Sequence, residues 1–257
     1  MNDRLGHLLG EHECLWGIIC RDPTMIELEL IARAGYHVVW LDLEHGAMSN
    51  ETAVDFSRTI IHLGMVPLVR IPELSRSHVQ VLLDGGVQIL TLPDVRTVKQ
   101  AAEFVKLGKY PPLGERGVAS SSANFDYRLE DPARTLCEAN AGTRLMVMIE
   151  NDEGLDAVDG IVGTEGIDML TIGPADWGAS NNLYGAEARE DLALKIDRVL
   201  EAAAQAGKTV AAGVFDPEQV GYYRDRGTRI IFTGVDVNLK RDVLEGTINQ
   251  FQKRVGG

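Results

Sequence analysis

The sequence predicts an α/β fold, a single TIM-like (β/α)8 barrel that spans residues 1–257. Eight short apolar segments alternate with stretches of helical pattern, and that number in about 250 residues is typical of this barrel. The apolar segments show no clean alternation between inward and outward residues, as expected for parallel strands that are buried on both faces. No linker and no change of composition marks a second domain.

The eight predicted strands share a high content of Val, Ile and Leu. They cover residues 15–20, 36–44, 65–71, 86–94, 144–150, 166–173, 209–215 and 228–234. The helices between them are indicated by end signals. The Asp-Pro pair at 22–23 is expected to open the first of these helices and Gly35 to end it, while Asn50 is expected to cap the second. A second Asp-Pro pair, at 216–217, predicts another helix start after the seventh strand.

The longest interval between strands runs from 94 to 143. It is predicted to hold helices at 95–107 and 129–140, separated by the Gly/Pro-rich segment GKYPPLGERG. Long irregular segments in compact domains are usually functional. A final helix is predicted over about residues 238–254.

Composition excludes several classes of partner. The net charge is −13, from 38 acidic and 25 basic residues, and a nucleic acid or an anionic membrane would require clustered Lys and Arg instead. No apolar run approaches the ~20 residues of a membrane span, and the first residues do not resemble a secretion signal. Three cysteines without a CxxC pair indicate no disulfide framework. A cytoplasmic location is expected.

Two acids follow neighbouring predicted strands. Glu150 comes directly after the fifth strand, and Asp176 follows the sixth in the segment IGPAD. In a β/α barrel the carboxyl ends of the strands carry the active site, and two oxygen ligands with open positions suit Mg²⁺ or Mn²⁺. Gly173 lies in a tight turn whose backbone N–H groups could face an oxyanion. The alternative is that both acids are structural and bond to backbone or to an arginine.

A histidine flanked by acids follows the second strand. Asp42, Glu44 and His45 lie in one loop on the predicted active-site face. A neighbouring carboxylate fixes the tautomer of an imidazole and raises its basicity, which suits a general base. A loop histidine paired with a local acid is the simpler alternative.

Two further charged residues and the lysines narrow the chemistry. Arg70 ends the third strand as either a structural ion-pair partner or an anion clamp. Asp84 ends a predicted helix, where its charge opposes the helix dipole. A Schiff-base mechanism needs a desolvated lysine at the barrel mouth, yet all seven lysines fall on helices, in loops or at the opposite end of a strand. A metal-dependent mechanism is therefore preferred over an imine.

The motifs around these residues, taken in order, resemble the HpcH/HpaI aldolase family. This family comprises metal-dependent pyruvate aldolases such as 4-hydroxy-2-oxoheptanedioate aldolase and 2-dehydro-3-deoxyglucarate aldolase. The resemblance covers nearly the whole chain through WG at 16–17, DP at 22–23 with Glu27, DLEHG at 42–46, PLVRIP at 67–72, LLDGG at 82–86, YPPLGERG at 110–117, MIE at 148–150 and IGPAD at 172–176. It implies a barrel of the phosphoenolpyruvate/pyruvate-binding type. It also implies a homo-oligomer, commonly a hexamer built as a trimer of dimers, in which the last helix is exchanged between subunits.

The resemblance also implies roles and a reaction. His45 would be the acid/base, Asp84 would raise its basicity, and Arg70 would stabilise an enolate. The metal, Mg²⁺, Mn²⁺ or Co²⁺, would be bound by Glu150 and Asp176. Ala175 and Asp176 would contact the pyruvate unit through their backbone. The implied reaction is reversible cleavage of a 4-hydroxy-2-oxo acid to pyruvate, or a close analogue, and an aldehyde.

Three departures from the family pattern leave the substrate open. Met148 stands where the family usually has a substrate-contacting Gln, Trp177 and Gly178 replace a Leu and a small residue, and the segment 119–127 lacks an arginine often found near Asn124. Two alternative functions therefore accompany the aldolase hypothesis. One is a metal-dependent decarboxylase or other enolpyruvate lyase acting on oxaloacetate-like acids, and the other is a 2-oxo-acid-binding barrel with little turnover.

Overall fold

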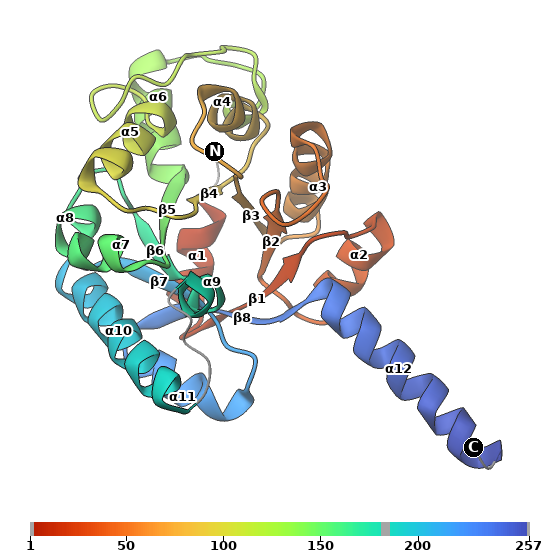
Figure 1. Cartoon of the computed structure of the whole chain (residues 1–257). Coiled ribbons are helices and arrows are strands. Elements are labelled where there is room, and N and C mark those ends of the chain that lie inside the picture. The colour runs from red at the N-terminus through yellow and green to blue at the C-terminus, as the bar shows by residue number, and fades with distance from the viewer. Residues whose placement is uncertain (1–2, 181–185, 256–257) are drawn as a thin grey trace.

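The structure is a computed structural model that describes residues 3–180 and 186–255. Its eight strands close into one barrel in which each strand pairs in parallel with the next and the last returns to the first (Figure 1). The strands are β1 (Leu15–Cys20), β2 (Val38–Asp42), β3 (Val66–Arg70), β4 (Ile89–Leu92), β5 (Arg144–Ile149), β6 (Met169–Ile172), β7 (Thr209–Gly213) and β8 (Thr228–Val235). The predicted (β/α)8 barrel is confirmed, and each strand lies in its predicted segment except that β8 extends one residue beyond it, to Val235.

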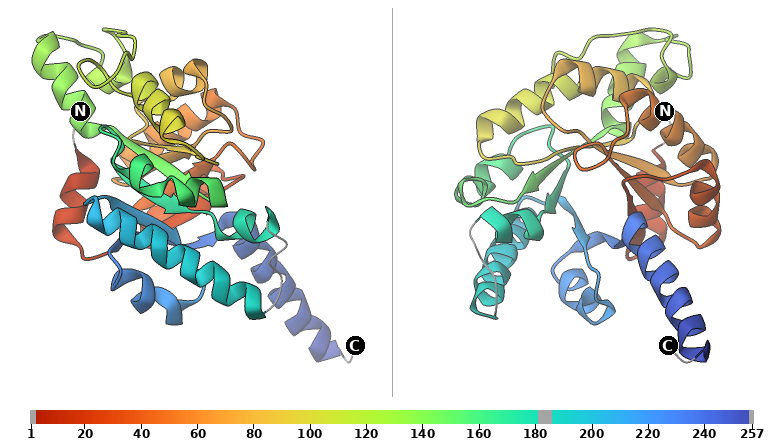
Figure 2. Two further views of the ribbon diagram at one scale, coloured as in Figure 1. Left: turned by 60° about the vertical axis from the view of Figure 1, so that its left-hand side comes forward. Right: turned by 45° about the vertical axis from the view of Figure 1, so that its right-hand side comes forward.

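The helices surround the barrel, as the two views of Figure 2 show. They are α1 (Arg4–Glu11), α2 (Met25–Arg33), α3 (Asn50–His62), α4 (Arg76–Asp84), α5 (Val98–Gly108), α6 (Pro132–Gly142), α7 (Asp152–Asp156), α8 (Val158–Val162), α9 (Pro174–Ser180), α10 (Ala186–Gln205), α11 (Val220–Arg224) and α12 (Asp236–Val255), with 3-10 turns η1 (Ala123–Phe125) and η2 (Pro217–Gln219). Helix α1 was not expected from the sequence. Its Leu5 and Leu8 join the cluster inside the barrel, so α1 closes the amino-terminal end.

Two predicted helix starts are wrong, because nearby hydroxyl side chains cap the helices instead. Helix α2 begins after Thr24, whose hydroxyl accepts a hydrogen bond from the backbone N–H of Glu27 while the Glu27 carboxylate accepts one from Thr24. This capping box displaces the start from the Asp-Pro pair at 22–23. Helix α3 is capped by Ser49 rather than by Asn50. The predicted cap at Asp216 is confirmed, although it opens the 3-10 turn η2.

The remaining helix ends differ from the prediction by a few residues. Helix α5 starts at Val98 rather than at residue 95, because Thr97 and Gln100 form a second capping box. Helix α6 starts at Pro132 behind its Asp131 cap. The last helix starts at Asp236, whose buried carboxylate accepts hydrogen bonds from backbone N–H groups of the β1–α2 loop.

The core has two layers. One cluster fills the barrel interior and another lies between the strands and the helices. Side chains that point into the barrel occupy every second position along a strand. The residue two positions after an apolar interior residue therefore also points into the barrel, at its carboxyl end. Trp40 is followed two residues later by Asp42, Leu68 by Arg70 and Met148 by Glu150. The strand pattern therefore delivers three charged side chains to one rim.

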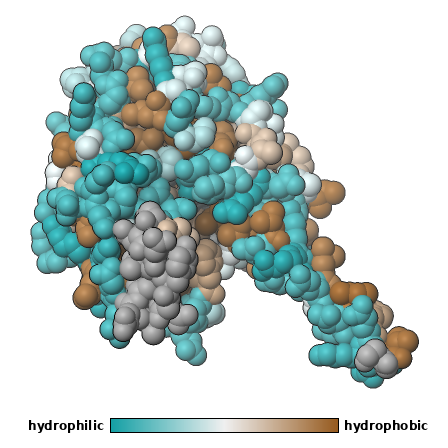
Figure 3. All heavy atoms as spheres, in the orientation of Figure 1, coloured by the Kyte–Doolittle hydropathy of each residue, from teal (hydrophilic) through white to brown (hydrophobic). Residues whose placement is uncertain are grey.

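Helix α12 leaves the barrel and projects outward (Figure 1). Its exposed apolar residues form a stripe that the space-filling view in Figure 3 shows along the projecting helix: Leu239, Val243, Leu244, Ile248, Phe251 and Val255. Within the described ranges no helix combines the length and apolar character needed to cross a membrane. The three cysteines are free thiols.

Candidate active site

A cavity of about 790 Å³ opens at the carboxyl ends of the strands. Arg70, His45, Met148 and Asp176 line it together. The volume is in the range of small-molecule sites, and the position is that of the active site in β/α barrels. Sequence-predicted residues at the ends of β2, β3, β5 and β6 therefore meet at one cavity, whereas Glu44 and Glu150 are not among the residues that line it.

Arg70 and Asp42 form a buried two-pronged ion pair. They are register partners on neighbouring strands, and Arg70 Nε and Nη2 lie 2.8 and 2.6 Å from the two oxygens of Asp42. Burial opposes the charge on Asp42, but the hydrogen bonds from Arg70 outweigh it and keep the pKa of Asp42 below its usual value. Asp42 thus fixes the orientation of the guanidinium, because two parallel hydrogen bonds hold its plane in place.

The remaining terminal nitrogen of Arg70 faces the cavity. Nη1 lies 2.8 Å from a carboxylate oxygen of Glu44 and 3.9 Å from the Met148 sulfur. Because a thioether is a weak acceptor, the N–H of Nη1 that faces the Met148 sulfur remains available to a stronger acceptor. The pKa of Glu44 is raised by burial, against the lowering effect of Arg70.

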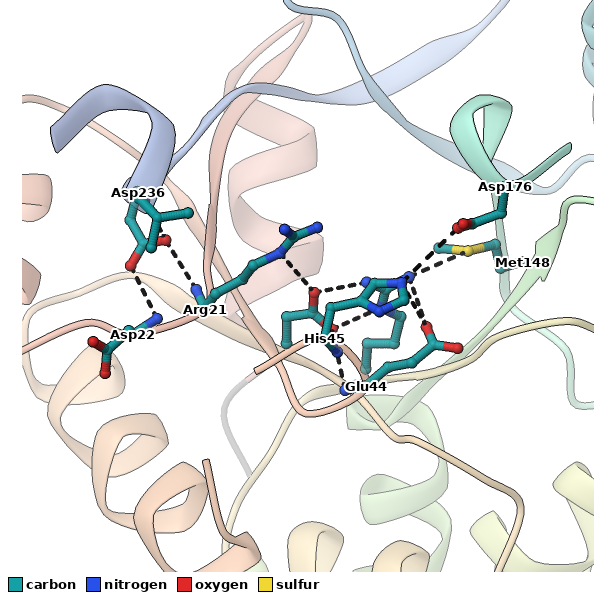
Figure 4. A network of polar contacts seen from close by, with 10 residues as sticks. Arg21, Asp22, Glu44, His45, Met148, Asp176 and Asp236 are labelled. Atoms are coloured by element: carbon teal, nitrogen blue, oxygen red, sulfur yellow. Dashed lines mark hydrogen bonds and ion pairs between the residues drawn. The ribbon is translucent and has the colours of Figure 1, made fainter. Parts of the chain in front are cut away.

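His45 stands between two carboxylates (Figure 4). Its Nε2 is 3.8 Å from Glu44 and 4.0 Å from Asp176, too far for direct hydrogen bonds. The side chain is 41% exposed, so a substrate hydroxyl or a water can reach the ring. The backbone N–H of His45 points to Asp42 at 3.4 Å, which ties the loop to the Arg70 pair.

Glu150 carries the strongest electrostatic signal of the site. One oxygen accepts a hydrogen bond from the backbone N–H of Asp94 at 2.7 Å, whereas Oε2 is buried and has no hydrogen-bond partner among the described residues. Burial, aided by the charges of Asp176 and Glu44, raises the pKa of Glu150 to about 7. A buried carboxylate oxygen without a partner is costly and fits a cation.

Gly173 makes room for this carboxylate. A Cβ at this position would overlap Oε2 of Glu150. Asp176 follows in the first turn of α9 and is more than half exposed, with Gly173 and Ala175 beside it in the cavity wall. No group of three or more His, Cys, Asp and Glu side chains suited to a metal occurs in residues 3–180 and 186–255. The site instead offers two carboxylates, an arrangement that suits Mg²⁺, which keeps several ligands from water and substrate.

Asp84 lies apart from these residues. Its carboxylate accepts hydrogen bonds from Arg116 at 2.7 Å and from Gln80 at 2.7 Å, and it is not among the residues that line the cavity. Within the described chain no contact joins it to His45.

Three residues of the site were missed by sequence reasoning. Arg21, at the end of β1, and Trp40, whose indole lies 5.6 Å below the Arg70 guanidinium, both line the cavity. Asp94 holds Glu150 through its backbone, with a φ of 49° that few residues adopt. Asp94 follows the strand-end Pro93, so its place at the active-site end of the barrel could have been inferred from the sequence. No sequence pattern distinguishes Arg21 or Trp40 from ordinary strand residues.

Comparison with known proteins decides the family. The profile of the HpcH/HpaI aldolase/citrate lyase family matches residues 18–242. The chain belongs to this family. The hydroxypyruvate/pyruvate aldolase of Paraburkholderia phytofirmans is 34% identical over 238 residues, covering 89% of this chain and 90% of that protein. The 2-keto-3-deoxy-L-rhamnonate aldolase of Salmonella gallinarum is 29% identical over 244 residues, covering 95% of this chain and 91% of that protein.

A solved structure agrees. The HpcH/HpaI aldolase from Desulfitobacterium hafniense superposes with a TM-score of 0.90 at 26% identity, covering 96% of both chains. The chain is thus an aldolase-family lyase with the TIM-like barrel of its relatives, and the resemblance drawn from the sequence motifs is confirmed.

Proposed function

We propose that this HpcH/HpaI family member is a divalent-metal-dependent aldolase. It would reversibly cleave a 4-hydroxy-2-oxo acid to pyruvate, or a close analogue such as hydroxypyruvate, and an aldehyde. The observation that carries the proposal is the unpartnered buried oxygen of Glu150, which packs against Gly173 in the wall of the cavity that Asp176, His45 and Arg70 also line. Relatives named as hydroxypyruvate/pyruvate and 2-keto-3-deoxy-L-rhamnonate aldolases support the substrate class.

Glu150 and Asp176 would hold the cation, which would be Mg²⁺, Mn²⁺ or Co²⁺. When bound, such an ion supplies Lewis-acid polarisation of the 2-oxo group. The backbone of Gly173, Ala175 and Asp176 lies beside the carboxylates and would bind the carboxylate end of the substrate. Met148 would pack against the substrate with its apolar side chain.

Arg70 would stabilise the charge that develops during cleavage. When the C3–C4 bond breaks, its electron pair moves toward the 2-oxo oxygen. The open N–H of Arg70 Nη1, now beside the Met148 sulfur, would donate to that oxygen. Because Asp42 already fixes the guanidinium, little reorganisation is needed, and preorganised donors of this kind are worth about 3–4 kcal/mol in other enzymes.

His45 would move the proton. Its exposed ring would accept the proton of the C4 hydroxyl as the C3–C4 bond breaks, directly or through water. The C4 carbon then leaves as the aldehyde carbonyl, and a proton added at C3 completes pyruvate.

The exposed stripe of α12 supports the proposed homo-oligomer. Its apolar residues cover one side of a helix that contacts the barrel only near its start. A second copy of the chain would cover this side by exchanging the helix, and a hexamer built as a trimer of dimers follows from the family resemblance. Light scattering should give a larger assembly for wild type than for Leu244→Glu with Phe251→Glu, while Asn249→Glu on the opposite side should not change the mass.

Pyruvate release tests the proposed reaction. A panel of 4-hydroxy-2-oxo acids should yield pyruvate with Mg²⁺ or Mn²⁺, lose activity in chelator and recover it when the metal is added back. His45→Ala should suppress aldol cleavage far more than oxaloacetate decarboxylation, since decarboxylation requires no proton removal from a hydroxyl. Full activity in chelator would exclude the metal-dependent mechanism.

A further inference from the structure

Arg21 places a second guanidinium in the active-site cavity. It lies directly after β1 and lines the cavity with its side chain 40% exposed. Its closest acid is Asp42, 3.5 Å from Nε. Among the side chains that the structure describes no acceptor is hydrogen-bonded to its side chain, and in Figure 4 its two terminal nitrogens point away from the polar network. The charge is therefore presented to the cavity.

Asp42 does not need Arg21 for its own neutralisation. Both oxygens of Asp42 are already held by Arg70 at 2.6 and 2.8 Å. The Arg21 contact is longer and uses Nε alone, which leaves the fork of terminal nitrogens free. A free fork of this kind matches a carboxylate or phosphate.

The backbone of Arg21 is held from two sides. Its N–H donates to Asp236 at 3.0 Å, and the N–H of Asp22 donates to the other oxygen of the same carboxylate at 3.1 Å. Its carbonyl packs so closely against Gly46 that a Cβ there would lie 2.8 Å away. The loop that presents the guanidinium is thus fixed by α12 and by the loop of His45, as a binding residue requires.

Arg21 lies across the barrel mouth from the carboxylates. In the closed order of eight strands, β1 is separated from β5 by three strands on either side and from β6 by two strands on the shorter side. Figure 4 shows Arg21 and Asp176 on opposite sides of His45. A substrate bound by its 2-oxo acid end at Glu150 and Asp176, with its C4 hydroxyl at His45, points its far end toward Arg21.

We propose that Arg21 binds an anionic group at the far end of the aldehyde half and so selects substrates with a terminal carboxylate or phosphate. This inference rests on the proposed aldolase function. Asp216, another charged residue of this cavity, is engaged as the cap of η2, where it accepts a hydrogen bond from Glu218. Arg21 is the cation at this end of the cavity, as far as the described residues show.

The test compares matched aldehydes in condensation with pyruvate. Succinic semialdehyde is paired with butanal, and D-glyceraldehyde 3-phosphate with D-glyceraldehyde, so that the two arms separate carboxylate from phosphate. Wild type should show a kcat/KM at least about tenfold higher for the charged member of one pair, as a hydrogen-bonded charge pair provides. Arg21→Met should remove that preference and leave the neutral aldehyde within about twofold, and Arg21→Lys should restore part of it.

Controls separate the possible failures. Thermal unfolding of Arg21→Met checks that the fold is intact. The preference of wild type for charged aldehydes is measured without any variant. Deuterium exchange at C3 of pyruvate, measured without aldehyde, reports the proposed chemistry alone. Exchange without any preference for charged aldehydes would overturn the role of Arg21, as would an equal loss for charged and neutral aldehydes in Arg21→Met. Absence of exchange would contradict the proposed function and the inference with it.

Discussion

Replacing Glu150 by Gln should change how the stability of the metal-free protein depends on pH. Glu150 is 6% exposed, and its pKa is raised from 4.5 to about 7. Since the folded state holds the proton more tightly than the unfolded chain, the contribution of Glu150 to stability is greatest below pH 4.5 and is lost as the pH rises through about 7.

The magnitude follows from that difference. A tenfold change in a protonation equilibrium corresponds to about 1.4 kcal/mol, so keeping Glu150 charged at high pH costs the metal-free fold about 3 kcal/mol. Between pH 5 and pH 8 the loss amounts to about 2–3 kcal/mol. Gln retains an acceptor for the Asp94 N–H but cannot ionise, so Glu150→Gln should lack this loss. Any constant cost of the amide cancels when the two pH values are compared.

Denaturant unfolding in chelator, at pH 5 and pH 8, measures this difference in the free energy of unfolding. Mg²⁺ or Mn²⁺ at about 100 times its dissociation constant should then stabilise wild type at pH 8 by about 2.7 kcal/mol and leave Glu150→Gln unchanged. An identical pH dependence in the two proteins would refute the assignment of the raised pKa to Glu150. Equal stabilisation of both by the cation would refute its role as a ligand.

Three further substitutions test the rest of the site. Gly173→Ala should weaken cation affinity about 10- to 100-fold, the usual cost of disturbing a residue that supports a metal ligand, because the new Cβ pushes Glu150 away. Unchanged affinity in a calorimetric titration would contradict this role of Gly173. Arg70→Lys should lower kcat by about 10²- to 10³-fold, since lysine cannot bind Asp42 in two-pronged fashion and still reach the substrate; steady-state kinetics measure it, and a change confined to KM would argue against charge stabilisation. His45→Gln should lower aldol cleavage by about 10²- to 10⁴-fold while C3 exchange of pyruvate declines less; equal losses would place His45 elsewhere in the mechanism.

The barrel was predictable because its signals are local and repeated. Each strand is an apolar run, and Asp42, Arg70 and Glu150 lie at or directly after the end of a strand. In a closed parallel barrel the strand ends converge on one rim whatever the details of packing. The convergence of His45, Arg70, Met148 and Asp176 on one cavity therefore follows from the positions of these residues at the ends of their strands.

Other features depend on contacts between distant segments and could not be predicted. The buried side chain of Asp236, more than 200 residues away, holds the loop before α2 through the backbone N–H groups of Arg21 and Asp22. Arg21 resembles any polar residue after a strand until the closed barrel shows it facing the cavity. Asp84 was linked to His45 by family resemblance, whereas within this chain its partners are Gln80, one turn earlier on α4, and Arg116, which the long connection between β4 and β5 brings to it.

The most direct test of the central claim is a Mn²⁺ titration of the chelator-stripped protein, followed by electron paramagnetic resonance. The account predicts one bound ion per chain in wild type, binding abolished or greatly weakened in both Glu150→Ala and Asp176→Ala, and binding retained in His45→Ala. Undiminished Mn²⁺ binding in both carboxylate variants would contradict it.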